Sequence, residues 1–177
     1  LLTFFILLLM LIFKPLLILN HLAPRSHCKR IKDLPYSVEE RHNLDLYLPK
    51  KIDITKPILV FIHGGSWDTG HKNDYLFAGF ALSEMGYITA IPNYRLYPQV
   101  QFPHFIDDVA VAIASLPTQL SRLGIRVNGS LPIVLIGHSA GAHTAAMLTS
   151  RPEYLKNANA AIELKALVGH AGPYDLP

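Results

Sequence analysis

Short apolar runs alternate with stretches of helical periodicity over most of this chain. Four runs are typical of strands: residues 58–62, 87–91, 133–136 and 166–168. The first of them is unbroken and rich in β-branched side chains, which predicts a strand buried on both faces. Residues 44–49 instead alternate apolar and polar side chains and end at a proline, which predicts a short antiparallel strand.

Three segments between these strands have helical spacing. Residues 74–85, closed by Gly86, and residues 140–148 are two predicted helices. One apolar face marks the third, an amphipathic helix: Phe105, Ile106, Val109, Ile113 and Leu116. Strands that alternate with helices predict the α/β class, with a mostly parallel open sheet and helices on both faces. Ligand sites in such sheets lie beyond the carboxyl ends of the strands.

The N-terminal segment differs from the rest. Residues 1–13 are apolar except for Thr3, which fits the core of a signal peptide, and with residues 16–19 the run approaches the length of a spanning helix. A basic flank follows, comprising Arg25, Lys29, Arg30 and Lys32. We therefore predict a hydrophobic signal or anchor segment at 1–22, which makes the protein membrane-anchored or exported (periplasmic or secreted). A buried core helix is the alternative.

We expect a basic linker at 23–42 and the N-terminal part of an α/β domain at 43–177. Of the 177 residues, half are hydrophobic and 16% are charged, which excludes a disordered chain. The net charge of +3 belongs to the N-terminal arm, because residues 1–51 hold eight basic and four acidic side chains. The body therefore lacks the basic face that nucleic-acid binding requires. With one cysteine, Cys28, and no metal-ligand spacing, we expect neither a metal nor a cofactor.

The strongest candidate chemistry is a glycine-flanked serine. The run Gly137-His138-Ser139-Ala140-Gly141 directly follows a predicted strand and directly precedes a predicted helix. In this G-x-S-x-G pattern, a sharp turn exposes a serine nucleophile at the N-terminus of the helix. The alternative is a merely structural Gly-Ser turn.

A second glycine motif follows the first predicted strand of the body. It reads His63-Gly64-Gly65-Ser66-Trp67. Acyl transfer creates a tetrahedral oxyanion, and adjacent glycines let backbone N–H groups approach it closely enough to donate. An ordinary Gly-Gly turn is the alternative.

Together these motifs resemble the α/β-hydrolase fold, in the esterase and lipase branch with an HGG oxyanion loop. Three further segments are similar to that branch: Asn93-Tyr94-Arg95-Leu96 with Pro98, Asp107-Asp108-Val109, and Gly172-Pro173-Tyr174-Asp175. Among its members, the chain is most similar to bacterial carboxylesterases related to feruloyl esterases, kynurenine formamidases and prenylcysteine methylesterases. The resemblance covers about residues 43–177.

The resemblance implies a serine hydrolase that cleaves a small-molecule carboxylic ester through an acyl-enzyme intermediate. It makes Ser139 the nucleophile and the backbone amides of Gly65, Ser66 and Ala140 the oxyanion donors. His63 would brace the loop without acting as a base, and Trp67 would pack under the loop or line the acyl pocket. The remaining motif positions would support the two turns: Gly64, Gly137 and Gly141.

The family order places the triad acid and the base histidine after the last strands. We therefore expect the sequence to be a fragment, incomplete at the C-terminal end of the sheet, that has little activity by itself. Asp175 is a weak candidate for the acid. Three histidines lie near the serine without an obvious route to its hydroxyl, namely His138, His143 and His170, and His71 and His104 are expected to be loop residues without partners.

Two other functions stay open. The first is a non-catalytic α/β-hydrolase-like domain that binds ligands while attached to a membrane. The second is amide or peptide cleavage by the same serine chemistry.

Overall fold

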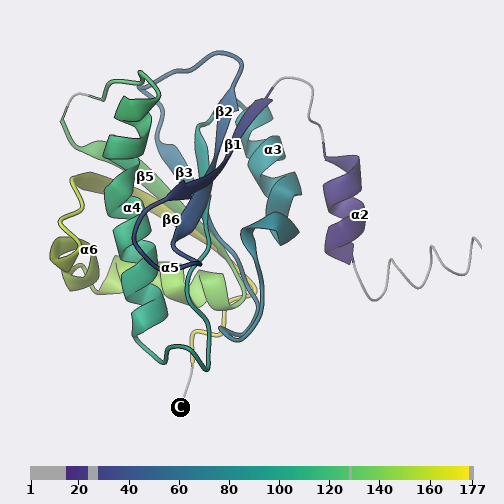
Figure 1. Cartoon of the computed structure of the whole chain (residues 1–177), viewed down its shortest axis with the longest axis vertical. Coiled ribbons are helices and arrows are strands. Elements are labelled where there is room, and N and C mark those ends of the chain that lie inside the picture. The colour runs from purple at the N-terminus through teal and green to yellow at the C-terminus, as the bar shows by residue number, and fades with distance from the viewer. Residues whose placement is uncertain (1–14, 24–27, 128, 176–177) are drawn as a thin grey trace, which may run out of the picture.

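A computed structural model describes residues 15–23, 28–127 and 129–175, in which a six-stranded sheet has the order β1-β2-β4-β3-β5-β6 (Figure 1). The strands are β1 (Cys28–Pro35), β2 (Asn43–Pro49), β3 (Ile58–Ile62), β4 (Thr89–Pro92), β5 (Leu131–His138) and β6 (Ile162–His170). Strands β3, β4, β5 and β6 are parallel, whereas β2 pairs antiparallel with β1 and β4. The predicted α/β class, the four parallel strands and the antiparallel strand at 44–49 are confirmed.

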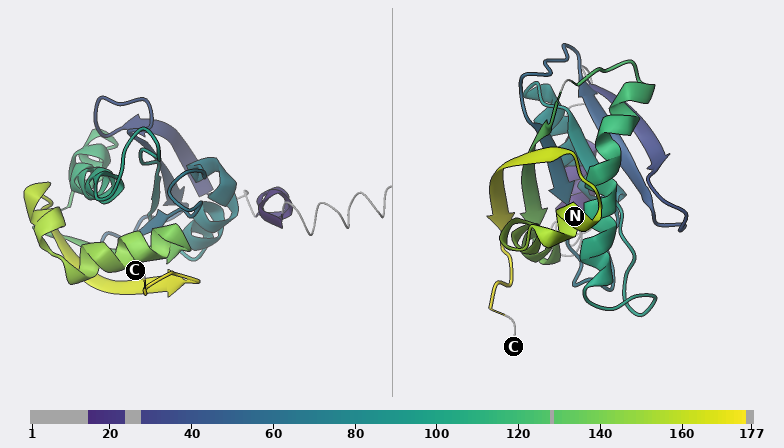
Figure 2. Two further views of the ribbon diagram at one scale, coloured as in Figure 1. Left: turned by 90° about the horizontal axis from the view of Figure 1, so that it is seen from below. Right: turned by 90° about the vertical axis from the view of Figure 1, so that its left-hand side faces the viewer.

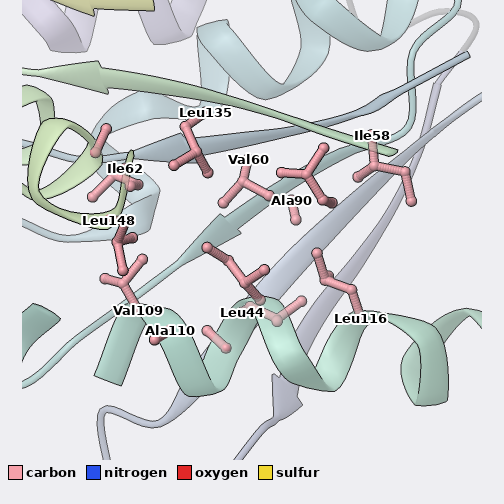
Figure 3. Packing of buried hydrophobic residues seen from close by; sticks show 14 of the residues in the cluster. Leu44, Ile58, Val60, Ile62, Ala90, Val109, Ala110, Leu116, Leu135 and Leu148 are labelled. Atoms are coloured by element: carbon pink, nitrogen blue, oxygen red, sulfur yellow. The ribbon is translucent and has the colours of Figure 1, made fainter. Parts of the chain in front are cut away.

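The helices are α2 (Pro15–Leu22), α3 (Leu76–Glu84), α4 (His104–Arg122), α5 (Ala140–Ser150) and α6 (Glu153–Asn157), with a 3-10 turn η1 (Lys72–Tyr75) before α3. The three helices expected in the body are therefore present. All five side chains of the predicted amphipathic face of α4 are buried. They pack with α5 against one face of the sheet, where Val109, Leu116 and Leu148 meet Val60 and Leu135 (Figure 3).

The opposite face of the sheet is covered by α3, and α2 lies outside α3 on the side away from α4 (Figure 2). The buried Asn20 side chain holds α2 in place: its Nδ2 donates to the carbonyl oxygens of Asn73 and Asp74, at 2.9 and 3.1 Å, and its Oδ1 accepts from Phe77 N at 2.9 Å. A cavity of about 340 Å³ remains between α2 and the sheet, with Leu16 and His138 among its lining residues.

Strand β1 lies inside the range that the sequence predicts as a basic linker. Its charged side chains obscure any strand periodicity, and one of them, Arg30, is held by a buried partner. Asp45 of β2 is fully buried, accepts from Arg30 Nε at 2.6 Å and from Asp33 N at 2.9 Å, and pairs with Lys72 Nζ at 2.8 Å. The ion pairs that stabilise β1 therefore come from residues distant in sequence, which a local pattern does not reveal.

The apolar run predicted at residues 1–13 lies outside the described residues. Within the described ranges, no helix combines the length and the apolar character needed to cross a membrane.

Candidate active site

Ser139 occupies a strained turn between β5 and α5. Its backbone has φ 53° and ψ −121°, a conformation that non-glycine residues avoid and that costs on the order of 1–3 kcal/mol. The turn is held from outside, because Ser139 N donates to the carbonyl oxygen of His170 at 2.8 Å. Ser139 itself is half-buried. We call residues 137–141 the serine turn; its geometry presents a side chain at the edge of the sheet, as a nucleophile requires.

A second strained segment follows β3 and is called the glycine loop here, residues 63–70. Gly65 has φ 124°, and the two residues after it, Ser66 and Trp67, have φ 51° and 62°. The loop closes on itself, since the carbonyl oxygen of Gly65 accepts from the N–H groups of Asp68 and Thr69 at 3.1 and 2.9 Å. Successive backbone N–H groups in a tight turn can form a concave site for an anion.

The glycine loop and the serine turn touch each other. Both leave the carboxyl ends of adjacent parallel strands, where Ile62 of β3 pairs with Gly137 of β5. A Cβ placed on Gly64 would lie 3.1 Å from the Cβ of Ser139 and 2.9 Å from the carbonyl oxygen of His138. The two motifs therefore lie against each other at the same edge of the sheet.

The backbone N–H groups that the resemblance assigns as oxyanion donors are those of Gly65, Ser66 and Ala140. Within the described part of the chain, none of the three donates to a protein acceptor. By contrast, the N–H of Gly64 is used, donating to the hydroxyl of Tyr75 at 3.3 Å. The structure thus leaves these three N–H groups without a described protein acceptor.

The base of the glycine loop is fixed by a buried histidine. His63 is fully buried and stacks on Tyr94 with ring centroids 4.2 Å apart, and its Nδ1 lies 2.9 Å from the carbonyl oxygen of Gly64. Burial lowers the pKa of His63 to about 3, so its ring is neutral at physiological pH. Tyr94 donates its hydroxyl to the carbonyl oxygen of His63 at 2.8 Å. These contacts hold the His63 ring against the base of the loop.

Arg41 holds the other end of the loop. Its Nη2 donates to the carbonyl oxygen of Gly70 at 2.8 Å and its Nε donates to that of Tyr94 at 2.7 Å. Nothing in the sequence around Arg41 indicates this position, because both acceptors are backbone atoms far along the chain.

Two of the three further segments that are similar to the family are joined by an ion pair. Arg95 donates to Asp108 of α4 through Nε and Nη2, at 2.9 and 2.6 Å. Burial alone would raise the pKa of Asp108, but the hydrogen bonds from Arg95 lower it below its ordinary value. Asp108 therefore stays ionised and fixes the segment that follows β4 to helix α4.

The side chain of Trp67, within the glycine loop, packs against α4 and α5. Its ring stacks on Phe105 of α4 at 5.6 Å between centroids and meets His143 of α5 edge-on at 5.3 Å. Of the two roles considered for this residue, these contacts favour packing.

None of the described histidines supplies a base to Ser139. His138 points to Tyr75, with Nδ1 2.8 Å from the tyrosine hydroxyl, and His143 packs on Trp67. The exposed His170 stacks on His138 at 5.5 Å. In the described residues, no hydrogen bond joins any of these rings to the Ser139 hydroxyl, and the exposed Asp175 forms no ion pair.

The expectation that His71 and His104 lack partners is wrong. His71 caps η1 by accepting from Asn73 N at 3.0 Å, and its Nε2 contacts Asn93 Nδ2 at 2.9 Å. His104 Nδ1 lies 3.5 Å from Asp107 one helical turn later. Among the described residues, no three His, Cys, Asp or Glu side chains are grouped so as to hold a metal ion.

Comparisons with known proteins identify relatives of this chain. A family model described as BD-FAE matches residues 44–177. The isoprenylcysteine alpha-carbonyl methylesterase of Arabidopsis thaliana is 34% identical over 150 residues, covering 82% of this chain and 34% of that protein. The kynurenine formamidase of Danio rerio is 30% identical over 126 residues, covering 71% of this chain and 41% of that protein. The chain therefore spans about a third to two fifths of the length of these curated relatives.

Solved structures show the same fold. A putative thioesterase from Silicibacter sp. matches with a TM-score of 0.63 and 28% identity, over 85% of this chain and 51% of that one. Esterase B from Lactobacillus rhamnosis matches with a TM-score of 0.69 and 22% identity, over 86% of this chain and 51% of that one. The fold is that of the α/β-hydrolases.

Proposed function

Because this chain belongs to the BD-FAE family of α/β-hydrolase esterases, we propose that it carries the nucleophile and the oxyanion donors of a serine hydrolase that cleaves small-molecule carboxylic esters. The observation that carries the proposal is the contact between the two motifs. Gly64 packs against Ser139, and the N–H groups of Gly65 and Ser66, the next two residues of the loop, have no described protein acceptor. A binding domain has no need for a strained serine next to unpaired amides.

In the proposed reaction, the Ser139 Oγ attacks the acyl carbonyl carbon and transfers its proton to a histidine base. The carbonyl oxygen becomes an oxyanion and accepts hydrogen bonds from the N–H groups of Gly65, Ser66 and Ala140. Collapse of the tetrahedral intermediate breaks the ester C–O bond, and the alcohol leaves with the proton. Water then attacks the acyl-Ser139 ester and releases the carboxylic acid. None of the contacts described above assigns the acid or the base of the triad.

Preorganised amides of this kind contribute strongly to catalysis. Removing one such donor typically costs about 3 kcal/mol of transition-state stabilisation. The strained backbone at Ser66 and Ser139 lies at a proposed donor and at the proposed nucleophile. Both groups must be held in place before substrate arrives, which is where proteins tolerate such strain.

The proposal is tested by covalent trapping. The protein expressed from its full reading frame should hydrolyse a p-nitrophenyl ester and react with a fluorophosphonate probe. Mass spectrometry of the digested adduct should place the probe on Ser139. A protein that folds but neither hydrolyses the ester nor acquires the probe would instead support the non-catalytic binding domain.

We also propose that the N-terminal segment directs the protein to a membrane, either as an anchor or as an export signal. The apolar run at 1–13 supports this, as does α2, on which Leu17, Leu19 and Leu22 are exposed. Deletion of residues 1–22 should move the protein to the soluble cytoplasmic fraction. A deletion of residues 1–13 alone keeps α2 and so separates the contribution of the apolar run from that of α2. If both deletion variants fractionated with the membrane as wild type does, the proposal would be contradicted.

A further inference from the structure

Tyr75 is a buried aromatic residue held on several sides. It ends η1, and its side chain is 4% exposed. Its ring packs on Phe61 of β3 and on Phe77 of α3, with centroids 5.1 and 6.0 Å apart. Because the ring is fixed by these neighbours, the position of its hydroxyl is set by the fold rather than by rotation of a free side chain.

That hydroxyl contacts both halves of the proposed site. The N–H of Gly64, in the glycine loop, donates to Tyr75 Oη at 3.3 Å. The same oxygen lies 2.8 Å from Nδ1 of His138, in the serine turn. Gly64 directly precedes the donor Gly65, and His138 directly precedes Ser139. The hydroxyl oxygen of Tyr75 therefore contacts one residue that directly precedes a proposed oxyanion donor and another that directly precedes the proposed nucleophile.

The protonation states give the hydrogen bonds one direction. Burial raises the pKa of the Tyr75 phenol, which keeps its proton, and burial together with the nearby His170 lowers the pKa of His138. A neutral imidazole can accept at Nδ1. The bonds then run from Gly64 N–H to Tyr75 Oη, and from Tyr75 O–H to His138 Nδ1.

We propose that Tyr75 is a positioning residue whose hydroxyl sets the spacing between the oxyanion donors and the nucleophile; this rests on the proposed function. The hydroxyl holds the inward-facing N–H of Gly64, which leaves the next two amides of the loop free to donate to substrate. Without it, the N–H of Gly64 loses its buried acceptor and the loop loses its polar link to the serine turn. A displacement of about 1 Å in such a geometry can cost up to about a hundredfold in rate.

Tyr75→Phe is the direct test, because it deletes one oxygen and keeps the packed ring. We expect kcat for ester hydrolysis to fall about tenfold or more, with KM changed less than about twofold, because substrate binding is left intact. Tyr87→Phe, which removes a hydroxyl before β4 and away from the site, should leave both constants unchanged. Equal kinetics for Tyr75→Phe and wild type would overturn the proposal.

Variants of His138 test the other end of the link. In His138→Asn, Oδ1 can accept from Tyr75 in place of Nδ1, so this variant should keep most of the rate. His138→Leu has no acceptor and should resemble Tyr75→Phe. Combining His138→Leu with Tyr75→Phe should cost little more than either change alone, because residues acting as one unit are non-additive. Fully additive losses would contradict a shared link.

Hydrogen exchange measures the link without catalysis. In Tyr75→Phe the amide of Gly64 should exchange at least about tenfold faster by NMR, whereas the amide of Val60 in β3 should be unaffected. Unchanged exchange at Gly64 would overturn the proposal whether or not the protein is active. If wild type hydrolyses no ester, the proposed function fails by itself, and faster exchange at Gly64 still establishes the link between the two motifs.

Discussion

Ser139→Ala is expected to lower kcat/KM for ester hydrolysis by about 10⁴-fold or more and to abolish fluorophosphonate labelling. The substitution removes the atom that forms the acyl-enzyme bond, so water must attack the substrate directly. Only the oxyanion donors and substrate binding then remain to accelerate the reaction. The effect should fall on kcat, because the side chain that is lost makes its bond to substrate only along the reaction path.

The folded structure should survive this change. In the described residues, the Ser139 side chain makes no hydrogen bond, and the turn is held by backbone bonds to His170, Ala142 and His143. Circular dichroism and the midpoint of thermal unfolding should therefore match those of wild type. Ser150→Ala, at the exposed end of the same helix, is the matched control and should label normally. Undiminished labelling of Ser139→Ala would end the assignment of the nucleophile.

Much of the fold could be predicted because local pattern and burial agree. The run at 58–62 is apolar at every position, and all five side chains of β3 are buried. The helical face from Phe105 to Leu116 is buried in the same way. Strand β1 was not predicted because its pattern is set by pairing partners instead. Its Arg30 pairs with Asp45 of β2 and its Asp33 pairs with Lys72 of η1, and β1 carries no continuous apolar face of its own.

In the candidate site, too, residues with a local sequence pattern could be predicted and residues placed by long-range contacts could not. The serine turn and the glycine loop were found because each requires glycine at a fixed spacing, which leaves a mark in the sequence. Tyr75 and Arg41 were not found, since one side chain contacts a residue 63 positions away and the other contacts carbonyl groups 29 and 53 positions away. A tyrosine or arginine at such a position has no local signature. Only the fold shows that Tyr75 contacts both motifs and that Arg41 holds the end of the glycine loop.

Gly141 gives the largest expected effect on stability. It is the second residue of α5, close to the end of β3, and a Cβ there would lie 2.1 Å from the carbonyl oxygen of Ile62 and 2.5 Å from that of His63. Both obstacles are backbone atoms of a buried strand end, so neither can rotate away. Gly141→Ala should lower the free energy of unfolding by about 3 kcal/mol or more, measured by urea unfolding.

Gly124→Ala is the matched control for steric contact. A Cβ at Gly124 would meet nothing within 4 Å, and only its φ of +77° opposes the change, at about 1 kcal/mol. If both variants lost equal stability, close packing between β3 and α5 would not be the reason why the serine turn requires glycine at position 141. A larger loss for Gly141→Ala would mean that the same close approach that stabilises the fold also brings the glycine loop against Ser139. Stability and the proposed chemistry then both depend on the contact between β3 and α5. A Gly141 variant that stays folded by moving these two elements apart should therefore hydrolyse esters more slowly than wild type.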